Sequence, residues 1–486
     1  MACTTLGPDY AEPEVSWLEG WESNLYGQAG AADSSGTTGE DLAFWWRAFN
    51  DPVLNQLIEA ARRENPSLHI AGLAIARNRA LLGIAVGNQY PQLQQGRGAY
   101  TRLDSWPTEG ANSGERSGFD DYIVGFDVGW EVDFWGRYRR GIESADASFL
   151  ASVADQQNAQ VLLSAEVART YFIYCTTAEQ IEIARRNAAL QKRSLEITRH
   201  LYDSGQQAEL DLQQAKTQYL GTTATIPQFE ISLQQVANAL SALLGRAPGD
   251  LPELAAKPSD LPTVDPLTVQ ALPASLMMRR PDVRSAALQV AAQSARIGIA
   301  EANLYPAVSL FGTVAWSGDS IDGSTDALGT GIGPGFTWNL FNYGRLENNV
   351  RAEDALLQQA IESYQNTVLQ AAREIDDAAI SVVKTREQDA ILAEALTAAE
   401  RSLTLSTSRY REGYSSFVRV LDAQRALAAQ SANYVANKGA HLSAVVDFYK
   451  ALGGGWRAAT PDEYLPARVR EVMQERTCLL YTSDAA

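Results

Sequence analysis

Hydrophobic and polar residues alternate strictly along the segment from Tyr122 to Phe134. Its even-numbered positions are apolar or aromatic, whereas its odd-numbered positions are mostly glycine or acidic residues. A similar alternation runs from Ile332 to Phe341. Such a period of two is typical of β-strands that have one apolar face. The sequence therefore predicts a strand in each segment, and each is preceded by a less regular strand, near residues 91–103 and 306–317.

The pattern changes to a helical one after each pair of strands. Glycine is absent from Ile142 to Ser204 and from Arg345 to Glu412, and both tracts also lack proline. These two residues are the strongest helix breakers, so each tract is predicted to form one uninterrupted helix. At a rise of 1.5 Å per residue, each helix would be on the order of 100 Å long.

Each long helix is expected to end at a glycine, Gly205 or Gly413, and a second helical pattern follows over residues 206–244 and 414–452. Apolar residues form narrow stripes along these segments, which favours coiled-coil packing between neighbouring helices. Pro227 lies within the first return helix and is expected to kink it. The sequence thus predicts two long helical hairpins.

The strands and hairpins belong to an internal repeat. The segment WEVDFWGRYRR at 130–140 returns as WNLFNYGRLEN at 338–348, 208 residues later. Beyond the turn, LDLQQA at Leu210 matches LDAQRA at Leu421, 211 residues later, so we expect three extra residues near the second turn. The chain is expected to begin with an N-terminal segment and equatorial region (1–64) and to end with a C-terminal segment (454–486). Repeat 1 (65–245) would contain the strand pair 91–135 and the hairpin 137–244. After an equatorial linker (246–280), repeat 2 (281–453) would contain the strand pair 306–343 and the hairpin 345–452.

The two faces of the predicted strands differ in a way that suits a membrane barrel. Asp127, Glu131 and Asp133 lie on one face and large aromatic residues on the other, as expected for water inside and lipid outside. An open sheet edge is not tolerated in lipid, and the smallest membrane barrels have about 8 strands. Four strands cannot close, so several chains must share one barrel. Two chains would give a filled barrel of 8 strands, whereas three would give 12 and leave an aqueous lumen, the arrangement we expect.

Composition excludes several other classes of protein. The net charge of the 486-residue chain is −18 and it has no basic cluster, which argues against nucleic-acid binding. We see no run of about 18 apolar residues and expect no transmembrane helix. Three cysteines and three histidines are too scattered for a disulfide framework or a metal site, and His69, His200 and His441 all fall on helical patterns. We therefore expect no enzyme activity, no metal and no cofactor.

The three cysteines have different expected roles. Cys175 lies in an apolar helical stretch and is expected to be a small buried residue. Cys3 precedes a polar, proline-containing stretch, as the acylated cysteine of a mature lipoprotein does, so an N-terminal lipid on Cys3 is expected. Cys478 lies in a tail, residues 477–486, whose character differs from the rest and which we expect to be non-native.

Several motifs resemble one family. They are CTTLGPDYAEP, WWRAFNDPVLNQLI, LMMRRPDVRSAA at 276–287 and RYREGYSSFVRVLDAQRALAAQ at 409–430. Between about Cys3 and Trp456 the chain resembles the TolC-like outer-membrane efflux factors, in the OprM- and NodT-like lipoprotein branch. The resemblance implies a mixed α and β membrane protein. In that family, three chains form one 12-stranded outer-membrane barrel, which long coiled-coil hairpins continue as a periplasmic α-barrel.

The resemblance also implies a function and partners. The chain would be the exit duct of a tripartite system in the outer membrane of a Gram-negative bacterium, anchored by its lipid and extending into the periplasm. Substrate would come from an inner-membrane pump, of the resistance-nodulation-division type, through a periplasmic membrane-fusion adaptor. Alternatives are a component of type I protein secretion or heavy-metal efflux, or a coiled-coil adaptor without a pore, which would leave the amphipathic strands without a purpose.

Residues near the hairpin turns stand where the family has its constriction. These are Tyr410, Arg411, Val418, Asp422 and Arg425, with Tyr202 and Asp211 as their counterparts in the first copy. Three symmetry-related aspartates would form an acidic ring that attracts cations. The alternative is an acidic residue that merely stabilises a helix N-terminus. For Arg279, Arg280 and Asp282 of the RRPD motif we expect a structural role, because Pro281 should open a helix there and the nearby charges should set the entry into it.

Overall fold

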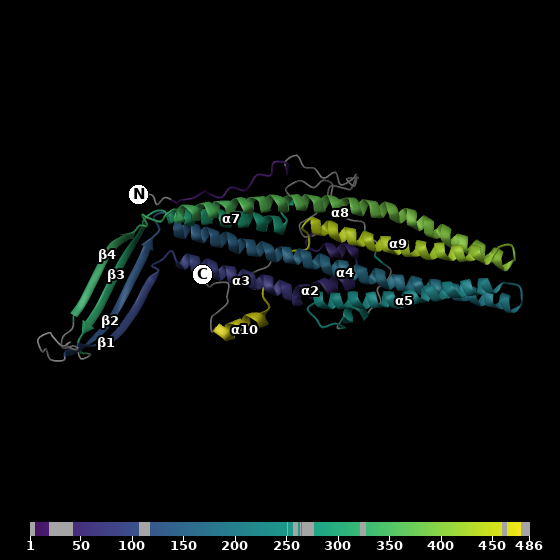
Figure 1. Ribbon diagram of the computed structural model, residues 1–486, viewed down its shortest axis with the longest axis horizontal. Coiled ribbons are helices and arrows are strands. Elements are labelled where there is room, and N and C mark those ends of the chain that lie inside the picture. Colours follow the sequence, from purple (N-terminus) through teal and green to yellow (C-terminus); the bar gives the residue numbers. More distant parts are fainter. Residues whose placement is uncertain are drawn as a thin grey trace.

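The computed structural model describes residues 5–18, 42–105, 117–249, 251–255, 261–262, 264, 277–320, 327–458 and 464–477. Figure 1 shows an elongated molecule with four strands at one end and long helices along the rest of its length. Cys3 and Cys478 lie outside the described residues, so the lipid site and most of the unusual tail are not part of this description.

The two predicted hairpins are present. The first consists of α4 (Arg137–Asp203) and α5 (Glu209–Leu243), and the second of α8 (Arg345–Arg411) and α9 (Phe417–Ala451). Both long helices are continuous for 67 residues. The expected absence of breaks is therefore confirmed. Pro227 lies inside α5, which continues through it, and the kink expected there stays a prediction.

The two hairpins have turns of equal length, so the expected insertion of three residues is wrong. Residues 204–208 join α4 to α5 and residues 412–416 join α8 to α9, and both helices of the second hairpin start 208 residues after their counterparts in the first. A shift of three residues is close to one helical turn and keeps the same face of the helix in register, which explains the misleading motif match. In the structural register, Asp422 corresponds to Gln214 and Asp211 to Arg419.

Four strands form one antiparallel sheet in the order β1-β2-β3-β4. They are β1 (Leu93–Ser105), β2 (Ser117–Val132), β3 (Ala307–Gly318) and β4 (Ala327–Thr337). The alternation predicted β4 over 332–341, and this position is corrected. Thr337 pairs with Ala307, the first residue of β3, so residues 338–341 have no strand opposite them. Glycine at every odd position from 329 to 335 lets the strand begin earlier than the apolar pattern indicated.

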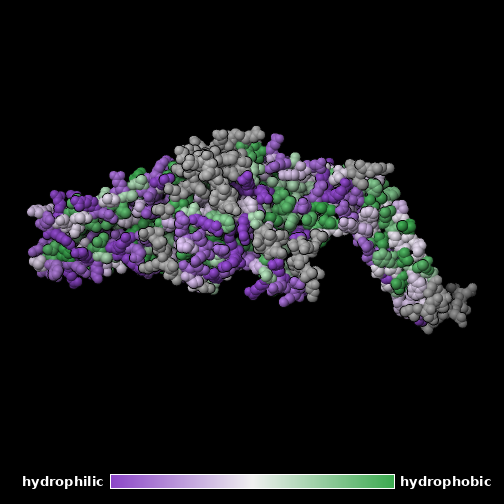
Figure 2. Space-filling model, turned by 180° about the vertical axis from the view of Figure 1, so that it is seen from behind, coloured by the Kyte–Doolittle hydropathy of each residue, from purple (hydrophilic) through white to green (hydrophobic). Residues whose placement is uncertain are grey.

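The register of the sheet gathers large apolar residues of β2, β3 and β4 on one face. Val124 pairs with Trp316 and Phe126 with Val314, while Ile332 lies opposite Gly312. Figure 2 shows hydrophobic residues spread over the strands, in contrast to the hydrophilic surface at the far end of the hairpins. The other face carries Asp127, Glu131 and six glycines of β2 and β4. Within the described chain, β1 and β4 each have one edge without a partner strand.

Shorter helices surround the long ones near the middle of the molecule (Figure 1). They are η3 (Trp45–Phe49), α2 (Pro52–Glu64), α3 (Pro66–Gly87), η4 (Pro252–Ala255), α7 (Pro281–Ala302) and α10 (Ala467–Thr477). The main core lies where η3 and α2 meet α4 and α9, and there the Trp45 ring stacks on Tyr449 at a centroid distance of 5.2 Å. This core fixes both hairpins to one another.

Helix α3 is the one helix among the described residues that is long and apolar enough to cross a membrane, with a mean hydropathy of 1.4 and 11% of its most apolar window buried. That criterion uses length and composition only, and Arg77 and Arg79 lie within the helix. The expectation of no transmembrane helix therefore stays a prediction. Helix α3 packs against α4.

The RRPD motif has the structural role that we expected. Helix α7 begins at Pro281, and Arg280, which is 7% exposed, precedes it. Its guanidinium donates to the Ala451 carbonyl at 2.8 Å and pairs with Asp282 and Glu374, each at 2.8 Å. Burial lowers the pKa of Arg280, but the two carboxylates outweigh it and the net shift is upward. One side chain thereby joins α7, α8 and the end of α9.

Candidate functional site at the hairpin tips

Both hairpin turns are closed by the same pair of backbone hydrogen bonds. Gly205 N–H donates to Tyr202 O at 2.9 Å, and Gln206 N–H donates to Leu201 O at 2.9 Å. Gly413 N–H donates to Tyr410 O at 3.1 Å in the second hairpin, again followed by a bond from the next residue. This is the Schellman arrangement, which needs a residue with positive φ, and both glycines have one, +73° and +80°. The two tips therefore share one backbone geometry.

An apolar cluster holds the tips of the two hairpins together. It comprises Ala215 of α5, Tyr410 of α8, and Phe417, Val420 and Leu421 of α9. The Tyr410 and Phe417 rings lie 5.5 Å apart, centroid to centroid. Because the cluster draws residues from both hairpins, the tips are packed on each other within one chain.

Polar contacts add to this apolar cluster. Gln424 of α9 donates to Ser194 Oγ of α4 at 2.6 Å, and Arg425 donates to Gln218 Oε1 of α5 at 3.2 Å. Gln424 is 6% exposed, so its hydrogen bond is largely shielded from water. A hydrogen bond between two buried side chains is costly to break when its partners stay buried. These contacts therefore resist separation of the second hairpin from the first.

The structure brings some of the predicted gate residues together. Tyr410 is buried, and burial raises its pKa, with a further increase from the nearby charge of Asp211. Asp422 and Arg425 lie 4.0 Å apart on α9, and both side chains are more than half exposed. Asp211 thus lies near the second hairpin, while Asp422 faces a solvated arginine of its own helix.

The remaining gate candidates lie at the surface. Val418 is 46% exposed and Tyr202 is 38% exposed. Arg411 is exposed and forms no ion pair with any described residue. Exposed side chains at these tips are free to face either a lumen or a partner, so the gate assignment of the whole set stays a prediction.

Sequence reasoning missed the buried glutamines near the tips. Gln191 of α4 is 2% exposed, and neither polar atom of its amide has a hydrogen-bond partner in the described part of the chain. Gln424 was also missed. A signal was present for Gln424, because it occupies a position on an otherwise apolar stripe of α9, where a polar side chain must be paired or serve a purpose. Gln191 gave no such signal, since its stripe of α4 also carries the buried Asn187 and Thr198.

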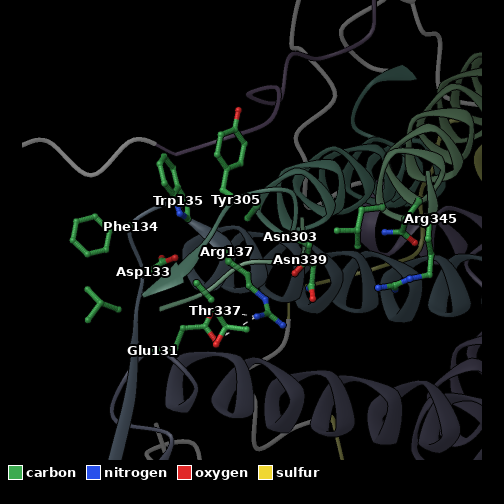
Figure 3. A pocket seen from close by; sticks show the side chains of 15 residues that line it. Glu131, Asp133, Phe134, Trp135, Arg137, Asn303, Tyr305, Thr337, Asn339 and Arg345 are labelled. Atoms are coloured by element: carbon green, nitrogen blue, oxygen red, sulfur yellow. Dashed lines mark hydrogen bonds and ion pairs between the residues drawn. The ribbon is translucent and has the colours of Figure 1, made fainter. Parts of the chain in front are cut away.

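A second polar region lies where the strands join the long helices (Figure 3). A cavity of about 420 Å³ is lined there by residues from both. Arg137 pairs with Glu131 at 3.2 Å and Arg139 pairs with Asp133 at 3.2 Å. Farther along β2, Asp127 pairs with Arg97 at 3.1 Å. Asp127, Glu131 and Asp133 are thus each paired with an arginine.

Aromatic residues occupy the same junction. Trp135 stacks on Tyr305 with 4.7 Å between centroids, and its indole N–H donates to Pro306 O at 2.9 Å (Figure 3). Trp338 is half exposed and Tyr343 fully exposed nearby in the sequence. Tryptophan and tyrosine at one end of apolar strands are typical of the girdle at a membrane interface.

The described residues contain no group of three or more His, Cys, Asp or Glu side chains that could hold a metal. Cys175 is buried as expected, and burial raises the pKa of its thiol to about 12. A thiol with that pKa is protonated near neutral pH and is a poor nucleophile. Packing in the main core is therefore sufficient to explain Cys175, and no reactive role is needed.

Relatives of the chain have been characterised. It is 30% identical over 463 residues to the solvent efflux pump outer membrane protein SrpC of Pseudomonas putida, covering 93% of this chain and 95% of the relative. It is 28% identical over 462 residues to the pyoverdine export outer membrane protein OpmQ of Pseudomonas aeruginosa, covering 94% and 96%.

Solved structures match over nearly the full length. The outer-membrane channel OprN is similar with a TM-score of 0.82 at 30% identity, covering 93% of this chain and 99% of that one. The Campylobacter jejuni CmeC outer membrane channel has the same fold, with a TM-score of 0.82 at 22% identity, and the match covers 96% and 100%. The model of the outer membrane efflux protein family matches residues 57–246 and 272–454, the two copies of the repeat. The chain therefore belongs to the outer membrane efflux protein family.

Proposed function

We propose that this protein is the outer-membrane exit channel of an efflux system, a passive duct for small molecules. One observation carries the proposal. The chain combines a sheet that has an apolar face and two unpaired edges with two long hairpins that continue from the same end. In a soluble coiled-coil adaptor without a pore, such a sheet would be harmful, because exposed apolar strands with free edges promote aggregation.

The channel is proposed to be a homotrimer. Four strands per chain need partners on both edges, and three chains supply 12 strands, enough for a barrel with an aqueous lumen. The family relationship to outer-membrane channels supports this arrangement. The two hairpins of each chain would then extend the duct into the periplasm.

Energy and substrates are proposed to come from partners, a periplasmic adaptor and an inner-membrane pump. Relatives named for efflux of solvents or toluene and for export of pyoverdine favour small organic molecules as cargo. A pump of the resistance-nodulation-division type is proposed from the family resemblance, with type I protein secretion and heavy-metal efflux as the alternatives. The duct itself is proposed to catalyse no reaction.

A lipid on Cys3 is proposed to anchor the chain beside the barrel. Leu6 N–H donates to Trp135 O at 3.1 Å, and Arg140 donates to Leu6 O at 3.0 Å, so the N-terminal segment is fixed where the strands meet α4. Leu6, three residues after Cys3 in the sequence, therefore lies at the aromatic junction that we assign to the membrane interface, which supports an anchor on Cys3.

The anchor has a direct test. Expressed behind a lipoprotein signal peptide and purified from the outer membrane, the protein should carry a lipid on Cys3 by mass spectrometry. Cys3→Ser should lose that lipid, whereas Cys175→Ser should keep it, because Cys175 is buried in the main core. An unmodified Cys3 in membrane-purified protein would contradict the anchor and leave the channel proposal intact.

The gate is proposed to lie at the hairpin tips, formed by Tyr202, Asp211, Tyr410, Arg411, Val418, Asp422 and Arg425. In a trimer, each aspartate would occur three times around the axis and attract cations. The charge of Asp211 acts on the buried Tyr410, so the packing of the two hairpins is proposed to be coupled to opening through this pair.

Planar-bilayer recording tests both the duct and its gate. The purified protein should give a small conductance that prefers cations. The double variant Asp211→Ala and Asp422→Ala should lower the cation preference severalfold, because two proposed rings of charge are removed. Glu400→Ala serves as a control, since Glu400 is an exposed acidic residue of α8 outside the gate set. Unchanged selectivity in the double variant would eliminate the gate assignment, and a monomer that never conducts would eliminate the duct.

A further inference from the structure

A cavity of about 780 Å³ lies midway along the molecule, away from both the tips and the strands. Residues of η3, α2 and α3 line it, together with the segment that follows α9. Figure 1 places α2 beside the middle of α4, and α3 between α2 and the strands. The volume is within the usual range of small-molecule sites, about 300–1,000 Å³. Nothing in the duct function calls for a cavity at this place.

Positive charge dominates the lining. Four arginines contribute to it, Arg47, Arg62, Arg63 and Arg457, against a single carboxylate, that of Glu59. The chain as a whole has a net charge of −18, so this concentration of arginine runs against its composition. Among these four, only Arg63 has an ion pair with a described residue, a loose 3.8 Å contact with Glu64.

Arg62 is the most constrained of the four. One of its Nη atoms donates to Gln160 Oε1 at 3.3 Å and also to the Gly455 carbonyl. The guanidinium lies 4.8 Å from the centroid of the Trp46 ring. Its Nε is buried and has no hydrogen-bond partner in the part of the chain that the structure describes.

Electrostatics at Arg62 favour an anion. Burial, together with the neighbouring charge of Arg457, lowers the pKa of Arg62 to about 10, although the carboxylate of Glu59 acts in the opposite direction. The group is still protonated at neutral pH, so the folded protein holds a partly desolvated charge without a carboxylate partner. A purely structural role of Arg62 explains its hydrogen bonds to Gln160 and Gly455. It leaves the unpaired Nε and the exposed guanidinium of Arg457 unexplained, whereas an anion would satisfy both.

The remaining walls are aromatic. Phe44, Trp46 and Tyr464 line the cavity, and the guanidinium of Arg47 lies 4.3 Å from the Phe44 centroid. Asn55 Oδ1 is buried in the same lining, again without a described partner. A few convergent polar groups within an aromatic wall are the usual composition of a site for an organic ligand.

We propose that this cavity binds a small aromatic anion, whose carboxylate or phosphate group pairs with Arg62 and Arg457 while its ring packs on Trp46. The site lies outside the duct and does not rest on the proposed channel function. Single-channel conductance reports on the duct separately, so the two proposals fail independently.

Calorimetric titration of the detergent-solubilised full-length protein tests the ligand class. Benzoate and phenyl phosphate should bind saturably, while benzyl alcohol and inorganic phosphate should bind at least about tenfold more weakly, because each lacks one half of the ligand. Equal binding of benzyl alcohol would overturn the role of the arginines. Equal binding of inorganic phosphate would overturn the role of the ring, and the absence of saturable binding by either aromatic anion would overturn the site.

Variants locate the binding. Arg457→Gln should raise the Kd for benzoate about tenfold, equivalent to about 1.4 kcal/mol. Arg457 is exposed, so the thermal unfolding temperature should not change and lost binding cannot be mistaken for unfolding. Arg186→Gln is the matched control, an exposed arginine of α4 that pairs with Glu179 outside the cavity. Unchanged affinity in the charge reversal Arg457→Glu would exclude this cavity as the site.

Discussion

Ile332→Arg should prevent the protein from assembling in the outer membrane. Ile332 is 92% exposed in the single chain and lies on the apolar face of β4, which we assign to lipid. An arginine near the middle of the membrane costs about 2–4 kcal/mol on the lipid face of a barrel. A trimer would meet that cost three times, which is enough to remove most of the inserted protein.

The control for this variant is a neighbour on the other face. Gly335→Arg places the same charge on the polar face of β4, where a Cβ would meet Ser309 Oγ at 3.6 Å, an ordinary contact. Fractionation of outer membranes and the yield of folded trimer on unheated gels measure both variants. Equal assembly of the two would mean that the apolar face does not meet lipid, and the barrel assignment would fail with it.

Arg280→Met should lower the stability of the helical part by about 3 kcal/mol. The substitution leaves the Ala451 carbonyl without its donor and removes the partner of Asp282 and Glu374. The loss is smaller than for a fully buried pair, because the Glu374 side chain is 36% exposed and water can solvate it. The methionine retains most of the side-chain volume, so the effect reports on charge and hydrogen bonding.

Thermal and denaturant unfolding of the solubilised protein measures this effect. Arg279→Met is the matched control, because Arg279 is the adjacent residue and is exposed. It should change stability by less than about 0.5 kcal/mol. Combining Arg280→Met with Glu374→Gln should cost less than the sum of the two single changes. A comparable loss in Arg279→Met, or strict additivity, would show that the network does not hold these helices together.

The local patterns of the sequence predicted most of the architecture. The long helices end at Asp203 and Arg411, each two residues before the glycine that was expected to stop them. Helix breakers act locally, so their absence is sufficient to predict a continuous helix. The predicted position of β4 was wrong because a strand extends only as far as it has a partner strand opposite it. The partner strand β3 begins at Ala307, which pairs with Thr337, so β4 ends there.

The hairpin tips were harder to predict for a related reason. Motif similarity located the turn residues, yet it paired Asp211 with Asp422, which the structural register separates by three positions. The burial of Tyr410 and the bond from Gln424 to Ser194 join segments more than 200 residues apart. Contacts of that kind depend on how the two hairpins pack against each other. The hydrophobic pattern of a single helix does not contain that information.

The unpaired edges of β1 and β4 have a genetic consequence. In the proposed trimer, the ring of three sheets would have three joints, each between β4 of one chain and β1 of the next. One chain with a damaged edge would open the ring even beside two normal chains. When normal and damaged chains are made in equal amounts, random association would leave about one complex in eight fully normal. Alleles that damage either edge would therefore be dominant in such a cell, because the fraction of intact channels falls as the cube of the share of normal chains.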